Sequence, residues 1–278
     1  MTDSTSQVGT PPSDRGTVLM SELTRPEYEA VIGESVVILP VGSTEQHGPH
    51  LPLGTDTIQV AEIAARVARQ LPALVAPTIP YGYRSGARTG GGEIFCGTTS
   101  LAGETLTLLA RDVLAALLRH GARRIAVLDG HYENSMFLSE AIHLALGGSG
   151  REDVRILKVL WAEAIDEETL ERAYPNGFRG WGLEHAAHLE TSVIGAIRPE
   201  LIRRDAIGKD GVESLPVYDV YPQPEGLIPS SGVLSDPSHA SERDGRLLLD
   251  QAVRGLVQMM RRELVEWTPN VVGGGLRR

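Results

Sequence analysis

The stretch SVVILPVG, residues 35–42, decides the fold class, because a run of β-branched and apolar residues suits a strand that is buried on both faces. Three further runs have the same strand character: LVAPTIPYG (74–82), RRIAVLDG (123–130) and DVRILKVLWA (153–162). These four runs predict the strands of a mainly parallel sheet.

Segments with helical periodicity separate and follow the predicted strands. We expect helices over residues 57–71, 101–120, 134–146, 185–197 and 245–267. Gly121 follows the second of these segments, at the position where helices often end in a left-handed residue. Because strands and helices alternate with short connections, the sequence predicts an α/β fold of three layers, with helices on both faces of the sheet.

A single domain accounts for the patterned part of the 278-residue chain. We expect flexible tails at residues 1–17 and 269–278, because their Ser-, Thr-, Pro- and Gly-rich composition cannot bury enough apolar surface to order them. The domain is then expected to span residues 18–268. Residues 205–240 are rich in Pro, Gly, Ser and Asp, and we expect an extended excursion over the surface there.

The charge and composition exclude several classes of protein. A formal net charge of −10 argues against a nucleic-acid partner, which would need a basic face to meet phosphates. The apolar runs are too short to span a bilayer, and residues 1–17 lack the basic and apolar segments of a signal peptide. The single cysteine cannot form an internal disulfide. We therefore expect a soluble cytoplasmic protein with no membrane partner.

Two of the predicted strands run directly into polar clusters. The segment STEQHGPHLPLGTD (43–56) contains Glu45, His47, His50 and Asp56, and the segment HYEN (131–134) contains His131 and Glu133. Ligands of open α/β sheets bind beyond the carboxyl ends of the strands, and imidazole with carboxylate suits Zn²⁺ and Mn²⁺. Without His50 these are five candidate ligands, three of them carboxylates. That is more ligands than one tetrahedral zinc needs. The pattern therefore favours two ions bridged by Asp56.

Several nearby residues have alternative interpretations. His50 is either a ligand or, more in keeping with its loop, a support for its neighbours. His185 and His188 would both face the site if they lay one turn apart on a helix, with His188 more structural in role. Glu184 is either a partner of a ligand histidine or a surface acid. Trp181, between glycines, either contacts a ligand or wedges between subunits.

Long segments of the chain resemble the creatininase (creatinine amidohydrolase) family. The resemblance is carried by LPVGSTEQHGPHLPLGTD (39–56), HGARRIAVLDGHYENSMF (120–137), GFRGWGLEH (177–185) and ETS (190–192). It extends from about residue 21 to the final helix and is closest to the members that act on creatinine.

The resemblance implies a role for each matched residue. One ion, often Mn²⁺, would be bound by Glu45 and His131, the other, usually Zn²⁺, by His47 and Glu133, and Asp56 would bridge them. Substrate contacts would come from Thr89, Tyr132, Trp181, Gly182 and His185. His185 would transfer a proton to the leaving nitrogen, helped by Glu133 or by a metal-bound water. The family also implies a homo-hexamer.

The activity implied by the resemblance is the interconversion of creatinine and creatine, by attack of a metal-bridging hydroxide on the ring carbonyl. Two departures from the family affect the substrate. Thr89 replaces a serine, and our alignment places Glu163 where the family has a mobile tryptophan, with Trp161 two residues earlier. The alternatives are hydrolysis of another cyclic amide, a formamide or a short peptide, or a metal-dependent binding protein without activity.

Overall fold

The central sheet has four parallel strands in a computed structural model that describes residues 16–147 and 152–268. The strands are β1 (Val36–Val41), β2 (Ala73–Val75), β3 (Arg124–Asp129) and β4 (Arg155–Leu160), in the order β2-β1-β3-β4. Val41 pairs with Asp129, and Asp129 pairs with Leu160. The carboxyl ends of β1, β3 and β4 are therefore level.

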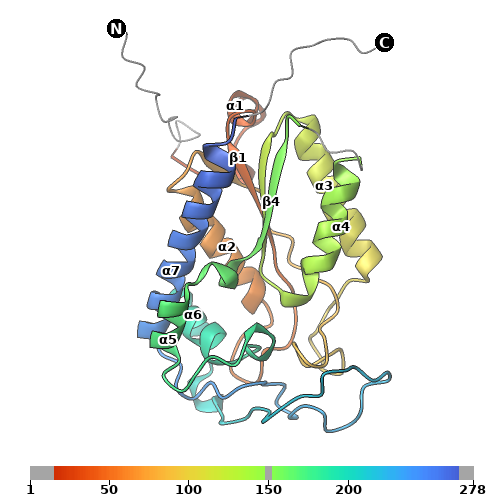
Figure 1. Cartoon of the computed structure of the whole chain (residues 1–278), viewed down its shortest axis with the longest axis vertical. Coiled ribbons are helices and arrows are strands. Elements are labelled where there is room, and N and C mark those ends of the chain that lie inside the picture. Colours follow the sequence, from red (N-terminus) through yellow and green to blue (C-terminus); the bar gives the residue numbers. More distant parts are fainter. Residues whose placement is uncertain (1–15, 148–151, 269–278) are drawn as a thin grey trace.

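Helices cover both faces of the sheet (Figure 1). One face carries α2 (Thr55–Ala68), α6 (His188–Ile197) and α7 (Glu242–Met260), and the other carries α3 (Gly103–Arg119) and α4 (Ser135–Ala145). Alternate residues of β1 enter the two cores: Val36 and Ile38 pack on the first face, and Val37 and Leu39 on the second. The structure thus confirms the three-layer α/β prediction.

Short helices complete the fold. Two are α-helical, α1 (Arg25–Val31) and α5 (Glu167–Ala173), and a π-helical turn, η7 (Arg261–Val265), extends α7. The 3₁₀ turns are η1 (Met20–Glu22), η2 (Tyr132–Asn134), η3 (Trp161–Ala164), η4 (Trp181–Leu183), η5 (Pro199–Leu201) and η6 (Arg204–Ala206). Of these turns, η2 is separated from β3 by Gly130 and His131, and η3 follows β4 directly.

Two predicted elements differ from the structure. The strand predicted over 74–82 ends at Val75, because Pro77 and Pro80 have no N–H to donate to a neighbouring strand. The helix predicted from His185 begins at His188, because the chain first turns through Ala186, whose φ is +53°. His185 therefore lies in the loop before the helix.

Residues 207–241 form no helix or strand and cross the end of the molecule opposite the termini, as expected for a surface excursion (Figure 1). Arg88 anchors this segment, because its Nε and Nη2 donate to Asp219 at 2.7 and 3.1 Å. The predicted tails lie outside the described residues, except for residues 16 and 17. None of the described helices is long and apolar enough to cross a membrane.

Candidate active site

The polar clusters at the strand ends meet because α2 approaches the sheet very closely there. A Cβ on Gly42, just after β1, would lie 2.7 Å from the Cα of Thr57, and a Cβ on Gly130, just after β3, would lie 3.0 Å from the backbone oxygen of Asp56. Only glycine leaves room for this contact. The first turn of α2 therefore carries Asp56 between the segments that follow β1 and β3.

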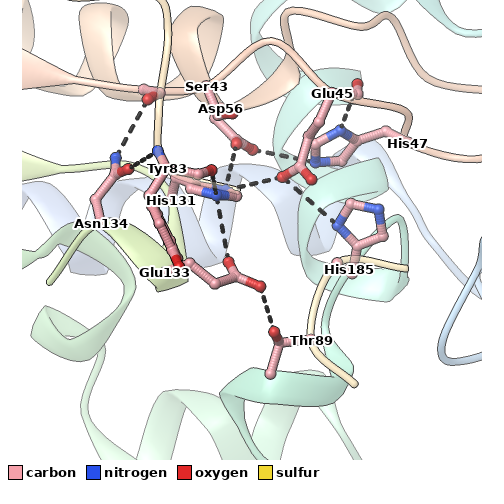
Figure 2. A network of polar contacts seen from close by, with 12 residues as sticks. Ser43, Glu45, His47, Asp56, Tyr83, Thr89, His131, Glu133, Asn134 and His185 are labelled. Carbon is pink, nitrogen blue, oxygen red and sulfur yellow. Dashed lines mark hydrogen bonds and ion pairs between the residues drawn. The ribbon is translucent and has the colours of Figure 1, made fainter. Parts of the chain in front are cut away.

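Asp56 lies at the centre of the cluster, with one carboxylate oxygen toward each of two histidines (Figure 2). Its Oδ1 is 3.1 Å from His47 Nε2, and its Oδ2 is 3.1 Å from His131 Nδ1. Glu45 Oε1 lies 2.8 Å from the same His131 nitrogen, and Glu190 Oε2 lies 3.4 Å from His47 Nε2. We refer to these five residues as the metal-facing cluster.

The cluster divides into two sets of three possible ligands that share Asp56. One set is Glu45, Asp56 and His131, and the other is His47, Asp56 and Glu190. A third group, Glu45 with His47 and His185, takes one residue from each set and leaves Asp56 unused. The two sets that share Asp56 can therefore be filled together, whereas the third group competes with both.

Burial and mutual pairing set the ionisation of the cluster. Burial alone would raise the pKa of Asp56, but the flanking His47 and His131 hold it well below its usual range. Burial raises the pKa of Glu45 to about 7, against the opposing effect of His131. Burial would lower the pKa values of His47 and His131, but carboxylates beside each ring raise both well above the ordinary value. The cluster thus strongly favours positive charge near its carboxylates.

The donor set fits divalent metal ions. Glu45 Oε2, His47 Nε2 and Asp56 Oδ2 are buried and form no hydrogen bond within the described residues. Buried polar atoms are costly when they are left without a partner. Imidazole nitrogen and carboxylate oxygen are the ligands of Zn²⁺ and related ions, and a bound cation would satisfy all three atoms.

Glu133 lies in a position that differs from its predicted role as a metal ligand. Its Oε1 accepts from Gly86 N at 2.7 Å and from the Thr89 hydroxyl, and its Oε2 lies 3.3 Å from His131 Nε2 (Figure 2). It belongs to none of the three groups, and Glu190 is the carboxylate that lies beside His47 instead. The predicted pairing of His47 with Glu133 is therefore not the arrangement of this structure.

His185 lies against the cluster and is held from behind by Gln46. Its ring centroid is 4.4 Å from that of His47, and Gln46 Nε2 lies 2.8 Å from its Nε2. Because Gly48 N donates to Gln46 Oε1, the amide nitrogen faces His185, and an amide nitrogen cannot accept. Burial and the nearby His47 lower the pKa of His185 well below its ordinary value. The neutral ring therefore carries its proton on Nδ1, which lies 3.9 Å from Glu45 Oε1.

Aromatic residues at the starts of three 3₁₀ turns form the wall of the cavity above the cluster. Tyr132 begins η2, Trp161 begins η3 and Trp181 begins η4, and all three line this cavity together with Thr89. Gly182 packs beside Thr89, whose Cγ2 would be 3.2 Å from an added Cβ. We refer to Thr89, Tyr132, Trp161 and Trp181 as the cavity wall.

The structure corrects the position expected for the residue that matches the mobile tryptophan of the family. Trp161 is buried and lines the cavity, whereas Glu163 is exposed and does not line it. The strand does not continue to Trp161, because β4 ends at Leu160 and η3 begins there. The 3₁₀ turn directs Trp161 inward, so this tryptophan occupies the place that our alignment gave to Glu163.

The alternatives left open for neighbouring residues are now decided by their contacts. His50 is a support, since its Nε2 lies 2.8 Å from Thr191 Oγ1 and it belongs to no ligand group. Glu184 accepts from Leu189 N at 3.0 Å rather than from a histidine of the cluster. His188 faces away from the cluster, with Tyr174 against its ring and Asp244 3.8 Å from its Nε2.

Two site residues were absent from the sequence-based prediction. Glu190 follows His188 at the same two-residue spacing as the other acid–histidine pairs, a pattern that could have identified it. Gln46 lies between Glu45 and His47, but no pattern indicated that its amide would reach His185. Asn134 supports the cluster from behind, because its Nδ2 donates to Gly42 O and to Asp129 Oδ1.

Comparison with known proteins gives a consistent set of relatives. The family model Creatininase (creatinine amidohydrolase) matches residues 21–260. The chain is 40% identical to creatinine amidohydrolase of Pseudomonas putida over 252 residues, covering 88% of this chain and 97% of that protein. It is 31% identical to the mycofactocin precursor peptide peptidase of Mycobacterium tuberculosis over 255 residues, covering 85% and 87% of the two chains.

Solved creatininase structures match the fold closely. They superpose with a TM-score of 0.86 at 39–40% identity, covering 89% of this chain and 98–99% of theirs. One is described with Mn, another as a Zn-Zn type and another in complex with creatine. Others carry a replacement at one of two tryptophans that lie twenty residues apart, which is also the separation of Trp161 and Trp181.

Proposed function

The chain belongs to the creatininase family of hydrolases, and we propose that it is a metal-dependent cyclic amidohydrolase that interconverts creatinine and creatine. The observation that carries this proposal is the position of Asp56, with one oxygen toward His47 and the other toward His131. A carboxylate that faces two separate ligand sets is suited to bridge two ions.

We assign Glu45, Asp56 and His131 to one ion, and His47, Asp56 and Glu190 to the other. Zn²⁺ and Mn²⁺, or two Zn²⁺, suit these ligands. When bound, two such ions would lower the pKa of water and polarise the substrate carbonyl. The assignment replaces Glu133 by Glu190 and leaves Glu133 free for proton transfer.

Hydrolysis of a cyclic amide forms a C–O bond to the carbonyl carbon, breaks the ring C–N bond and moves a proton to the leaving nitrogen. Glu133 is placed to accept the proton of the attacking water, because Gly86 N and Thr89 orient its carboxylate at the edge of the cluster. His185 would donate the second proton from Nδ1, where Gln46 leaves it, and the proton taken up by Glu133 would then return to that nitrogen and restore the neutral ring. The reaction consumes one water molecule and releases one ring-opened product, so it needs no further reactant.

The cavity wall would hold the planar ring of the substrate. Trp161 and Trp181 both line the cavity, and Phe178 packs edge-on against Trp181 with ring centroids 4.6 Å apart. Aromatic faces suit a flat, polarised ring such as creatinine. The substrate would thus be bound between the wall and the metal-facing cluster.

Turnover of creatinine by the metal-loaded protein tests the proposal. We expect hydrolysis with Mn²⁺ or Zn²⁺, the reverse reaction with creatine, and loss of both after chelation. No turnover in either direction with either metal would remove creatinine as the substrate.

A short peptide is the second candidate substrate, because a 31% identical relative is a precursor peptide peptidase. Another cyclic amide or a formamide would use the same proton-transfer residues. We also retain the homo-hexamer implied by the family as a proposal, which sedimentation of the purified protein would test.

A further inference from the structure

A second and larger cavity adjoins the cavity above the metal-facing cluster. It measures about 660 Å³, against about 50 Å³ for the inner cavity, and the two share Thr89, Tyr132, Glu133 and Leu160. These four residues line both cavities. A substrate whose reacting amide reaches the cluster can therefore extend a substituent into the larger space, which we call the outer cavity.

The outer cavity has an aromatic lining and one cation. Tyr83, Tyr132 and Phe137 supply the aromatic surface, and Tyr83 stacks on Phe137 with ring centroids 4.0 Å apart. Among the described residues that line this cavity, Lys158 is the one with a positive charge. The lining therefore combines an apolar surface with a single point of positive charge.

The Lys158 ammonium is held by hydrogen bonds to uncharged groups. It is half-buried on β4, and its Nζ donates to Ser135 O at 3.1 Å and to Ser135 Oγ at 2.5 Å. An ammonium has three N–H groups, so one is left to bind a ligand. Neither partner carries a charge. Lys158 lies near enough to the buried Asp129 for their charges to interact, but within the described residues it forms no ion pair with a carboxylate.

The two carboxylates of the outer cavity do not cancel this charge. Glu133 is turned toward Gly86, Thr89 and His131, as described above. Glu163 is exposed, so water screens it. A half-buried ammonium that forms no direct ion pair, beside an aromatic wall, is suited to bind a carboxylate.

We propose that the outer cavity is an acid-recognition subsite, and that the chain acts on cyclic amides bearing a carboxylate, which Lys158 binds while the ring amide meets the metal-facing cluster. This inference rests on the proposed amide hydrolysis for the reaction, and it names a substrate class wider than creatinine. Lys158 is the specificity-determining residue, since it contacts the substituent rather than the reacting atoms.

Matched pairs of cyclic amides test the subsite directly. Dihydroorotate and dihydrouracil differ by one carboxylate, as do 5-oxoproline and 2-pyrrolidone. We expect the zinc-loaded wild-type protein to bind the acid of each pair roughly tenfold more tightly, as for a hydrogen bond to a charged group, measured by calorimetry. Equal affinity within both pairs would overturn the proposal.

Variants of Lys158 assign the preference to this side chain. Lys158→Met, of similar length but uncharged, should reduce the preference to less than twofold and leave dihydrouracil binding unchanged, whereas Lys158→Arg should keep most of it. A preference that persists in Lys158→Met would contradict the proposal. Ser135→Ala removes a partner of Lys158 but keeps the charge. Ser135→Ala should therefore keep the preference for the acid, even if it lowers the Tm by as much as Lys158→Met does.

A variant at Glu163 keeps the test valid if Lys158→Met does not fold. Glu163→Gln removes an exposed negative charge from the cavity, so the preference for the acid should be at least as large as in the wild type. A smaller preference would contradict the proposal. Because the two amides of each pair can be compared in affinity whether or not they are hydrolysed, absence of hydrolysis would refute the proposed function while these affinities still decide the subsite.

Discussion

The metal-facing cluster and the cavity wall line one small cavity, but the chain builds them differently. The cluster residues come from strand ends and helix starts, and four of the five are at most 3% exposed. The wall residues Tyr132, Trp161 and Trp181 each begin a 3₁₀ turn, and Tyr132 is 48% exposed. The difference suggests that the rigid frame sets the reaction, while short turns, which can vary without disturbing the sheet, set the substrate.

Replacing Asp56, the carboxylate that the two ligand sets share, should have the largest effect on activity and on metal content. Asp56→Asn should lower kcat by on the order of 10³-fold or more, because two ions together stabilise the transition state by several kcal/mol. Metal content should fall well below two ions per chain, measured by elemental analysis of the dialysed protein. An active variant with both ions bound would show that Asp56 is not the bridge.

Substitutions of Glu190 and of Glu133 should have different effects, because we assign Glu190 to metal binding and Glu133 to proton transfer. Glu190→Gln should lose about one ion per chain, whereas Glu133→Gln should keep both ions and lose roughly 10²–10⁴-fold in kcat. The same elemental analysis and creatinine assay measure both effects. If Glu133→Gln lost an ion and Glu190→Gln did not, the original pairing of His47 with Glu133 would be restored.

A change in the wall should alter substrate binding without altering metal content. Trp181→Phe should raise the KM for creatinine by roughly two- to tenfold, since an aromatic contact beyond buried area is worth about 0.5–1.5 kcal/mol. Trp267→Phe is a matched control, because Trp267 lies near Arg155 at the far end of β4. Loss of an ion in Trp181→Phe would contradict this, because it would show that the cavity wall also affects metal binding by the metal-facing cluster.

The smallest expected effect is a dependence of stability on pH that arises behind the cluster. Burial and the nearby His47 lower the pKa of His50 to about 4 from an ordinary value of 6.5. As pH falls from 6.5 toward 4, the unfolded chain binds a proton that the folded chain does not. The free energy of unfolding should therefore decrease in this window, by at most about 1.4 kcal/mol per pH unit.

Denaturant unfolding of His50→Gln at pH 7 and pH 5 measures this contribution. The variant should lose less stability on acidification than the wild type. His143→Gln, on the exposed side of α4, should behave as the wild type does. A wild-type pH dependence in His50→Gln would assign the effect to other groups.

The contrast between cluster and wall also explains what the sequence could reveal. Strand-like runs followed by acid–histidine pairs predicted where Glu45, Asp56 and His131 would meet, because parallel strands end at one edge of a sheet. The helix α1 was not predicted, although Thr24 and Glu27 form a capping box around Pro26 that indicates its start. Local patterns of this kind are sufficient for elements and for residues at strand ends.

Other features depend on tertiary contacts that no local pattern contains. The spacing of His188 and Glu190 marks Glu190 as a candidate, but its contact with His47 depends on the packing of α6 beside α2, which no local pattern shows. The alignment with the family gave the tryptophan position to Glu163, because the sequence does not show that β4 ends at Leu160 and that the chain turns there. The wall was therefore harder to predict than the cluster.

Stepwise metal restoration of the chelated protein tests the central claim most directly. We predict that creatinine hydrolysis is absent without metal, stays low after one Zn²⁺ or Mn²⁺ per chain, and is restored at two ions per chain in the wild type but not in Asp56→Asn. Full activity without metal, or full activity with a single ion per chain, would contradict the account of two ions bridged by Asp56.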